Sequence, residues 1–446
     1  MPTYLLGLFG LLLLVTLLFM GMRVGIAMAL VGFLGIWYMR SLNVALNLMM
    51  NTPFATVRSE TLSVIPLFIL MGVVCANCGI SQELYQCCYK FVSRMRGGLA
   101  VATILACGCF SAICGSASAT TAAMGKICLP EMDRFKYKRT LTCGSISAGG
   151  TFGILIPPSV GFMLYAINAG IGVGTMFIAG IVPGLILILI YSIVALIICT
   201  IDPEAGPKGP IFTLVEKLKS TVSLIPVGIL FIIVLGGITF GICSATEGAA
   251  VGATGAFIFM MIRKQFNLKN VISSLKESAE TTAMIFMIMI GANLFSNFIS
   301  ATGLPQTFAK LVAGTDVHAI IVLVFCLLIY AILATFIDAL PLIVLLTPIF
   351  LPVIRSLDFG FTGGTDPVTI WFGVLMVMLM SFGIITPPVG MCCYVMAGVA
   401  PDTPLSTIFR GTFPFVIGLV VMIAIVIAFP SLATWLPGLT GGQKLF

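Results

Sequence analysis

The chain has 446 residues, of which 60% are hydrophobic and only 8% are charged. A soluble domain cannot bury that much apolar surface, so the composition excludes one and predicts an all-α polytopic membrane protein. The net charge of +7 is spread over loops and forms no patch that would bind nucleic acid.

Apolar segments predict two similar sets of membrane helices. The first set is 4–20, 24–39, 61–78, 98–128, 141–170 and 175–199. A polar linker, 201–220, separates it from the second set, which is 222–240, 246–262, 281–300, 318–354, 369–399 and 408–430. The first segment lacks the basic start and cleavage site of a signal peptide, so we expect a retained helix.

The two halves, 1–200 and 221–446, carry matching residues in the same order. Gly21 recurs as Gly241 and Glu60 recurs as Glu280, a spacing of about 220 residues. The spacing increases where the second half has the extra polar loop 360–367. The series predicts an internal repeat.

Positive charges predict how the two repeats are oriented. If 98–128 and 318–354 are re-entrant hairpins, each half crosses the membrane an odd number of times and the repeats are inverted. With a periplasmic amino terminus, most lysines and arginines lie on the cytoplasmic side, including Arg94, Arg96 and those of 134–139. This distribution follows the positive-inside rule and makes the linker cytoplasmic.

Two amphipathic stretches lie between a span and a hairpin. In 80–95, apolar residues recur at helical spacing with polar residues between them. We expect a helix lying flat at the membrane interface, with 304–312 as its weaker counterpart.

Each half also carries a pair of unusual segments. In the first half, the small-residue tip 115–121 of the hairpin is followed by a helix, 141–170, that is interrupted at 149–158. In the second half, the tip 336–341 is followed by the helix 369–399, interrupted at 381–388. Both interruptions end in a Pro-Pro pair. Broken helices expose backbone groups, which membrane proteins tolerate around a cavity.

These segments suggest cation-coupled transport of an anion. Free carbonyls and hydroxyls suit a small hard cation such as Na⁺, and helix amino termini favour a carboxylate. The expected sodium ligands are Ser116, Ser118, Thr120, Thr151, Gly153, Asp338, Thr347, Gly383 and Thr386. The expected substrate contacts are Thr121, Pro157, Pro158, Ala339, Pro387 and Pro388.

Several of these residues have a structural alternative. Ser116 and Thr120, one helical turn apart, suit close helix packing as well as ligation. Asp338 lies among apolar residues, which favours a functional role, although it could simply cap the hairpin helix. Glu247 is read as a structural acid at a helix start, and His318 as a surface residue.

The sequence predicts no cofactor and no transition-metal site. The 14 cysteines lie mainly in apolar segments without zinc-like spacing and are expected to be reduced thiols. One histidine cannot form a metal cluster.

The chain strongly resembles the large membrane subunit of tripartite ATP-independent periplasmic (TRAP) transporters over nearly its whole length. The most specific stretches are GSASATTAAMGKICLPEM at 115–132, AGGTFGILIPPS at 148–159 and GIITPPVG at 383–390. The resemblance implies sodium-driven uptake of an organic acid across the bacterial inner membrane by an elevator-type transport domain. It also implies a periplasmic substrate-binding protein and a small four-helix membrane subunit as partners, with membrane lipids around them.

The chain departs from the family pattern at three places. Ala117 stands where the family commonly has a second adjacent serine, so a ligand there could be lost, could be shifted by one residue to Ser118, or could be a backbone carbonyl. The usual Thr-Pro-Thr-Glu-Ala run reads Ser-Ala-Thr-Glu-Gly at 244–248. The loop 358–367 is longer than usual and is expected to face outside, where it could touch the binding protein.

Two other functions compete with this interpretation. A two-component sodium/dicarboxylate symporter would share the architecture but need no binding protein. An intramembrane aspartyl protease would need two facing catalytic acids, and the sequence offers one convincing buried acid, Asp338.

Overall fold

Every regular element in the described part of the chain is a helix, as the composition predicts. The structure, a computed structural model, describes residues 3–222, 224–313, 318–361 and 366–439. The first half contains α1 (Thr3–Phe19), α2 (Val24–Met39), α3 (Leu42–Arg58), the 3-10 helix η1 (Glu60–Ser63), α4 (Val64–Asn77), α5 (Ile80–Val92), α6 (Gly98–Cys114), α7 (Ala117–Arg134), α8 (Arg139–Gly150), α9 (Phe152–Leu155), α10 (Val160–Ala169) and α11 (Val173–Ile201).

The second half follows the same general order. It contains α12 (Leu214–Val222), α13 (Ile225–Phe231), the π-helical turn η2 (Ile232–Gly236), α14 (Gly237–Thr239), α15 (Ala245–Ile262), α16 (Leu268–Thr302), α17 (Leu304–Ala313), α18 (Ala319–Ala334), α19 (Ala339–Arg355), α20 (Pro367–Gly383), α21 (Met391–Val399), α22 (Leu405–Ala428) and α23 (Ser431–Leu439). In each half a helical hairpin precedes a helix broken at a proline pair, and a long helix follows.

Three elements differ from the sequence-based expectation. Helix α3 occupies a stretch for which no helix was expected, and α12 begins inside the expected linker 201–220. Helix α16 begins at Leu268 rather than near 281. The earlier start was not predicted because the first turns of α16 are polar, unlike those of a typical membrane segment. Both amphipathic stretches form helices, α5 and α17, and their position flat at the interface stays a prediction.

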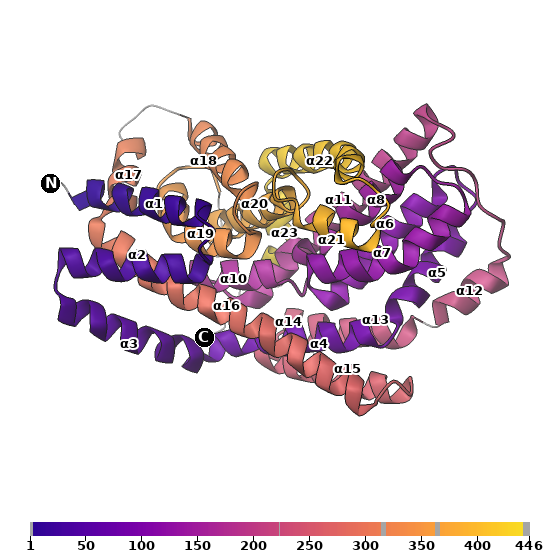
Figure 1. Cartoon of the computed structure of the whole chain (residues 1–446), viewed down its shortest axis with the longest axis horizontal. Helices are drawn as coiled ribbons and strands as arrows, with labels where there is room; N and C mark the ends of the chain where they lie inside the picture. The colour runs from indigo at the N-terminus through magenta and orange to yellow at the C-terminus, as the bar shows by residue number, and fades with distance from the viewer. Residues whose placement is uncertain (1–2, 223, 314–317, 362–365, 440–446) are drawn as a thin grey trace.

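Helices α2, α4, α15 and α16 pack closely and form what we call the framework. A Cβ atom on Gly25 would lie 2.7 Å from the Met287 carbonyl oxygen, and one on Gly32 would lie 2.6 Å from the Leu294 carbonyl carbon. Small residues therefore let α2 and α16 approach backbone to backbone, as membrane helices commonly do. Figure 1 shows α16 running past the hairpin α18–α19 toward α15.

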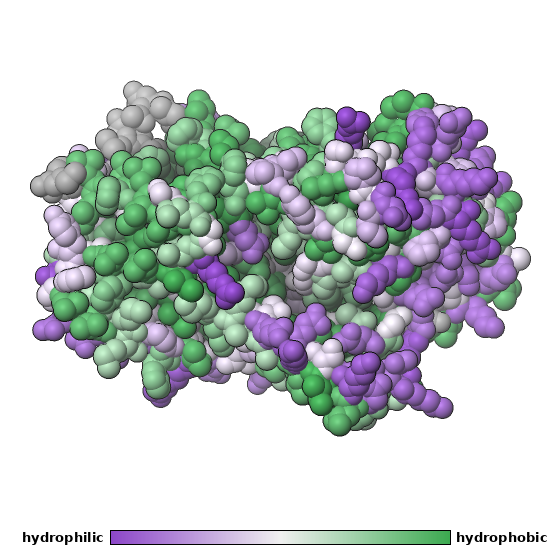
Figure 2. Space-filling view, viewed as in Figure 1, coloured by the Kyte–Doolittle hydropathy of each residue, from purple (hydrophilic) through white to green (hydrophobic). Residues whose placement is uncertain are grey.

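The molecular surface is that of a membrane protein. Among the described residues, six helical stretches are long and apolar enough to cross a membrane: Glu60–Asn77, Arg139–Ala169, Val173–Ile201, Ala245–Ile262, Leu268–Thr302 and Leu405–Ala428. Hydrophobic side chains dominate the surface over α1 and α2, whereas hydrophilic ones gather at the opposite end, over α5 and α12 (Figure 2). One end of the molecule is thus suited to water or lipid headgroups.

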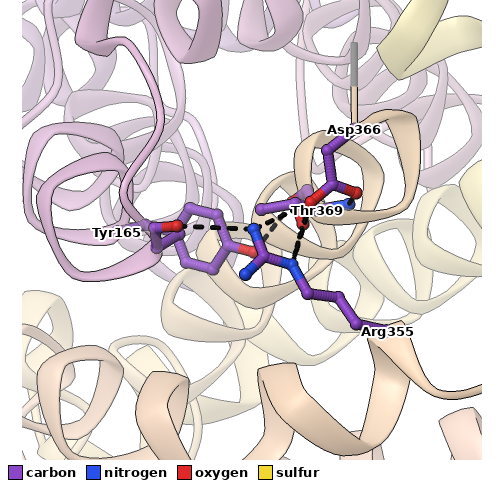
Figure 3. Close-up of polar contacts among 5 residues, drawn as sticks. Tyr165, Arg355, Asp366 and Thr369 are labelled. Atoms are coloured by element: carbon purple, nitrogen blue, oxygen red, sulfur yellow. Dashed lines mark hydrogen bonds and ion pairs between the residues drawn. The ribbon is translucent and has the colours of Figure 1, made fainter. Parts of the chain in front are cut away.

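A polar network joins the two halves at the ends of α10, α19 and α20 (Figure 3). Arg355, which ends α19, pairs with Asp366 at 2.7 Å and donates to Thr369 Oγ1 at 2.9 Å. Tyr165 of α10 donates its hydroxyl to the Thr369 carbonyl at 2.7 Å. These contacts connect the first broken helix to the second hairpin and second broken helix.

The predictions for Glu247, His318 and the cysteines agree with the structure. Glu247 completes a capping box with Ser244 at the start of α15, which is the structural role expected of it. His318 is exposed and precedes α18. All 14 cysteines are free thiols.

Candidate functional site

The tip of the first hairpin is a two-residue reversal between α6 and α7. Gly115 has a φ of +63°, a left-handed conformation that glycine adopts without a steric cost. Ser116 then caps α7, because its hydroxyl accepts a hydrogen bond from the Ala119 amide at 3.4 Å. The Ser118 hydroxyl lies 3.3 Å from that of Ser116.

The tip of the second hairpin is similar but carries a charge. Asp338 precedes α19, and its Oδ1 accepts a hydrogen bond from the Ala339 amide at 2.7 Å. Asp338 therefore does cap the hairpin helix, and it is half-buried. This bond occupies Oδ1, which leaves the other carboxylate oxygen available to a ligand.

The break in the first broken helix lies against the first tip. Helix α9 ends at Leu155 and α10 begins at Val160, with Pro157 and Pro158 between them. Proline cannot donate a backbone hydrogen bond, so a proline pair interrupts the helical ladder. A Cβ atom on Gly153 would lie 2.4 Å from the Ser116 carbonyl carbon. Only glycine permits this approach.

The second break contacts the second tip in a similar way. Helix α20 ends at Gly383 and α21 begins at Met391. A Cβ atom on Gly383 would lie 2.3 Å from the Ala334 carbonyl oxygen at the end of α18. The Val389 amide donates to the Thr335 carbonyl at 3.2 Å. In both halves, a hairpin tip is therefore packed directly on a helix break.

Both tips face one cavity of about 470 Å³, which also touches α4 and α16 of the framework. The expected site residues that line it are Ser116, Ser118, Asp338 and Ala339. The structure thus brings together residues that are about 220 positions apart in the sequence. The broken helices contribute the apolar side chains Ile154, Val160, Ile384 and Met391.

Two framework residues in this cavity were not expected from the sequence. Glu277 and Thr281, one turn apart on α16, line the wall together with Met284 and Ile285. Glu277 was missed because the polar start of α16 was not assigned to a membrane helix. The only signal for it in the sequence was an acid one helical turn ahead of a threonine and an apolar run.

The other expected residues do not line the cavity. Each of four threonine hydroxyls donates to its own helix: Thr121 to Ala117 O at 2.9 Å, Thr151 to Ala148 O at 2.7 Å, Thr347 to Ile343 O at 2.5 Å and Thr386 to Phe382 O at 2.5 Å. Thr120 is buried with its hydroxyl 3.4 Å from that of Ser111. A hydroxyl that donates to a carbonyl keeps its lone pairs, so these oxygens can still accept or ligate behind the tips.

The four prolines also lie outside the cavity lining. Pro157 and Pro158 are buried, and Pro158 contacts the first tip, since a Cβ atom on Gly115 would lie 2.6 Å from its carbonyl oxygen. Pro387 and Pro388 are exposed. The prolines interrupt the helices, and the residues on either side of them reach the cavity.

The cavity is acidic. Asp338 and Glu277 both line it, and its described lining residues include no lysine, arginine or histidine. No group of three or more histidine, cysteine, aspartate or glutamate side chains that could hold a metal occurs among the described residues. The available ligands are one or two carboxylates, hydroxyls and carbonyls, a donor set suited to a hard cation.

A multi-pass helical protein in which two hairpin tips and two broken helices surround one cavity belongs structurally to the class of secondary transporters. Sequence comparison then gives the family. The sequence model "Tripartite ATP-independent periplasmic transporter, DctM component" matches residues 11–432. The chain belongs to this family. It is a transporter permease subunit and not an enzyme.

Individual relatives agree with this assignment. The C4-dicarboxylate TRAP transporter large permease protein DctM of Pseudomonas aeruginosa is 34% identical, covering 87% of this chain and 88% of that protein. The sialic acid TRAP transporter large permease protein SiaM of Vibrio cholerae is 31% identical, covering 95% and 96%. The ectoine TRAP transporter large permease protein TeaC of Halomonas elongata is 29% identical, covering 94% and 96%.

A solved structure shares the fold. The YdaH transporter of Alcanivorax borkumensis, described as having an unusual topology, has a TM-score of 0.58 and covers 88% of each chain at 13% sequence identity. At that identity the likeness concerns the fold alone.

Proposed function

We propose that this subunit carries a small organic acid across the bacterial inner membrane, driven by the sodium gradient. The observation that supports the proposal is the shared cavity, where Ser116, Ser118 and Asp338 from the two tips meet. Such a site, built from broken helices and hairpin tips, can hold a cation and a carboxylate side by side.

The negative charge of the cavity gives a physical reason for coupling anion transport to sodium. With two carboxylates and no basic residue among its described lining, it repels an organic anion. A bound sodium ion would remove part of that repulsion, and the anion would in turn strengthen sodium binding, because such coupling is reciprocal. Asp338, the acid on a hairpin tip, is the ligand we assign to sodium.

Relatives suggest the substrate class and the partners. Their names specify a C4-dicarboxylate, sialic acid and ectoine, each of which carries a carboxylate. We expect the substrate to arrive on a periplasmic binding protein, and a small four-helix membrane subunit to support the framework. We expect the amino terminus to lie in the periplasm and the hairpins to move against the framework as an elevator.

Uptake into proteoliposomes tests the proposal. The subunit is reconstituted with its small membrane partner and the binding protein encoded beside it, and labelled succinate, sialic acid and ectoine are offered in turn. We expect one of them to accumulate only under an inward sodium gradient.

Three results would contradict this mechanism. Uptake that persists after sodium is replaced by potassium would show that sodium is not the coupling ion. Uptake that needs ATP would exclude secondary transport. Uptake of free substrate without any binding protein would instead favour a two-component sodium/dicarboxylate symporter.

A further inference from the structure

Helix α12 is amphipathic, and its polar side faces the protein. The Thr221 hydroxyl lies 3.7 Å from the Cys87 thiol of α5, and Lys217 Nζ lies 5.8 Å from the centre of the Phe91 ring. The opposite side carries Leu214, Val215, Leu218 and Val222, which recur at helical spacing. These four side chains are 76%, 74%, 65% and 61% exposed, respectively.

This orientation is the reverse of that of an amphipathic helix on a soluble protein. A helix with its polar face inward and its apolar face outward is stable where lipid acyl chains cover the apolar face. We therefore expect lipid to cover the apolar face of α12.

A polar groove of about 660 Å³ separates α12 from α5. Figure 1 shows the two helices side by side at one end of the molecule. The groove is lined by Gln82, Glu83, Gln86 and Lys90 of α5 and by Glu216, Lys219 and Ser220 of α12.

Both acids in the groove already have partners in the protein. The two carboxylate oxygens of Glu83 accept hydrogen bonds from the Arg263 guanidinium at the end of α15. Glu216 Oε2 accepts from the Thr213 amide at 2.8 Å and from its hydroxyl at 2.9 Å. These bonds, with a smaller contribution from Lys90, lower the pKa of Glu216, so it stays ionised in its role at the start of α12.

The two lysines form no close ion pair, although the charge of Lys90 favours the ionised form of Glu216. Within the part of the chain that the structure describes, neither Lys90 nor Lys219 lies within 4.0 Å of an acidic oxygen. The groove thus presents two ammonium groups and two amides beside an apolar helix face, while its two carboxylates are bonded within the protein. An ammonium group on a flexible stem binds phosphate as a point charge.

We propose that the groove between α5 and α12 binds the phosphate of a membrane phospholipid, whose acyl chains lie along the apolar face of α12. Lys90 and Lys219 would hold the headgroup, and Leu214 and Leu218 would contact the chains. This site is independent of the sodium and substrate cavity and does not rest on the function proposed for it.

The position of α5 gives the site a consequence for the whole subunit. Helix α5 connects α4 of the framework to α6 of the first hairpin, and the Glu83–Arg263 pair ties it to α15. A phospholipid in the groove would brace this joint from the membrane side. Lipid binding should therefore stabilise the subunit in detergent.

Native mass spectrometry and thermal unfolding of the full chain test the site. Wild type is titrated with dioleoyl phosphatidylglycerol in mild detergent, beside K90Q/K219Q and the control K208Q/K269Q, which removes two exposed lysines outside the groove. We expect the apparent Kd for the lipid to rise about tenfold or more in K90Q/K219Q. The control should bind like wild type, and inorganic phosphate at the same concentration should not reproduce the thermal shift.

The proposal is overturned by no lipid binding to wild type, by unchanged binding in K90Q/K219Q, or by an equal loss in the control. A thermal shift by inorganic phosphate equal to that by lipid also overturns it, because the site would then take free anions. Should K90Q/K219Q fail to fold, L218Q keeps both lysines and carries the test, with lipid binding expected to fall and unchanged binding counting against the site.

Discussion

Ser116 and Asp338 hold the same place in their hairpins. Each immediately precedes the second helix and caps it with a side-chain oxygen. Their spacing of 222 residues is that of the repeat predicted from the sequence. The first offers a neutral hydroxyl and the second a carboxylate, so two cation sites built on the tips would differ in affinity.

The substitution Asp338→Asn separates the two roles of this residue. Asparagine is as good a helix cap as aspartate, so the hairpin should fold normally. It lacks the negative charge, and we expect the sodium concentration for half-maximal uptake to rise by about tenfold or more, because cation affinity follows the charge of the ligands. The measurement is initial uptake in proteoliposomes as a function of sodium.

The capping box of α15 supplies the matched control. Glu247→Gln removes a capping carboxylate that does not line the cavity, and its sodium dependence should equal that of wild type. If Asp338→Asn also retains the wild-type sodium dependence while Asp338→Ala unfolds, Asp338 is only a cap.

At the scale of elements, each hairpin tip is held by a glycine of the helix break opposite it. Gly153 has the Ser116 carbonyl carbon 2.4 Å and the Ala117 nitrogen 2.6 Å from where its Cβ atom would be. Neither neighbour is a flexible side chain, so a methyl group would force the backbones apart. The distance between tip and break sets the position of every ligand they share.

We expect Gly153→Ala to displace the first tip and to lower both stability and uptake. Overpacking of this kind costs about 1–3 kcal/mol, which should appear as a lower apparent Tm in detergent. Gly398→Ala in α21 is the control, because nothing lies within 4 Å of its Cβ position. Equal behaviour of the two variants would mean that the tip adjusts freely and that the close contact has no functional role.

The hairpins and breaks were predictable because their chemistry is unusual for membrane helices. The tip 115–121 and the proline pairs stand out against apolar surroundings, and both lie where they were expected. Glu277 was not predictable in the same way. It lies in the polar first turns of α16, and only the packing of α16 beside the hairpins turns that stretch into a cavity wall.

At the scale of the molecule, the two halves must move together if the hairpins form one transport body. The network of Arg355, Asp366, Thr369 and Tyr165 is a direct link between them (Figure 3). It joins the second hairpin to α10 of the first half, so it holds both broken helices in one arrangement. The sequence could not reveal it, because Tyr165 is about 200 residues from Thr369.

The ionisation of Asp366 makes this link sensitive to acid. Burial opposes the charge of Asp366, but hydrogen bonds from Thr369 and the Arg355 guanidinium outweigh it and lower its pKa. A carboxyl whose pKa is lower in the folded state stabilises the fold above its unfolded pKa, near 3.9. That contribution disappears as the pH falls through the lower folded value.

Asp366→Asn should therefore lower the apparent Tm at pH 7 by roughly 1–3 °C, since a half-exposed ion pair contributes modestly. The difference from wild type should stay constant down to about pH 4 and shrink below it, where the wild-type carboxyl becomes protonated. Glu280→Gln is the control, because its pair with Lys276, at 3.9 Å and 69% and 75% exposed, should contribute almost nothing at any pH. If the difference in apparent Tm between Asp366→Asn and wild type stays unchanged down to pH 3, the network stabilises the contact between the two halves by packing rather than by charge.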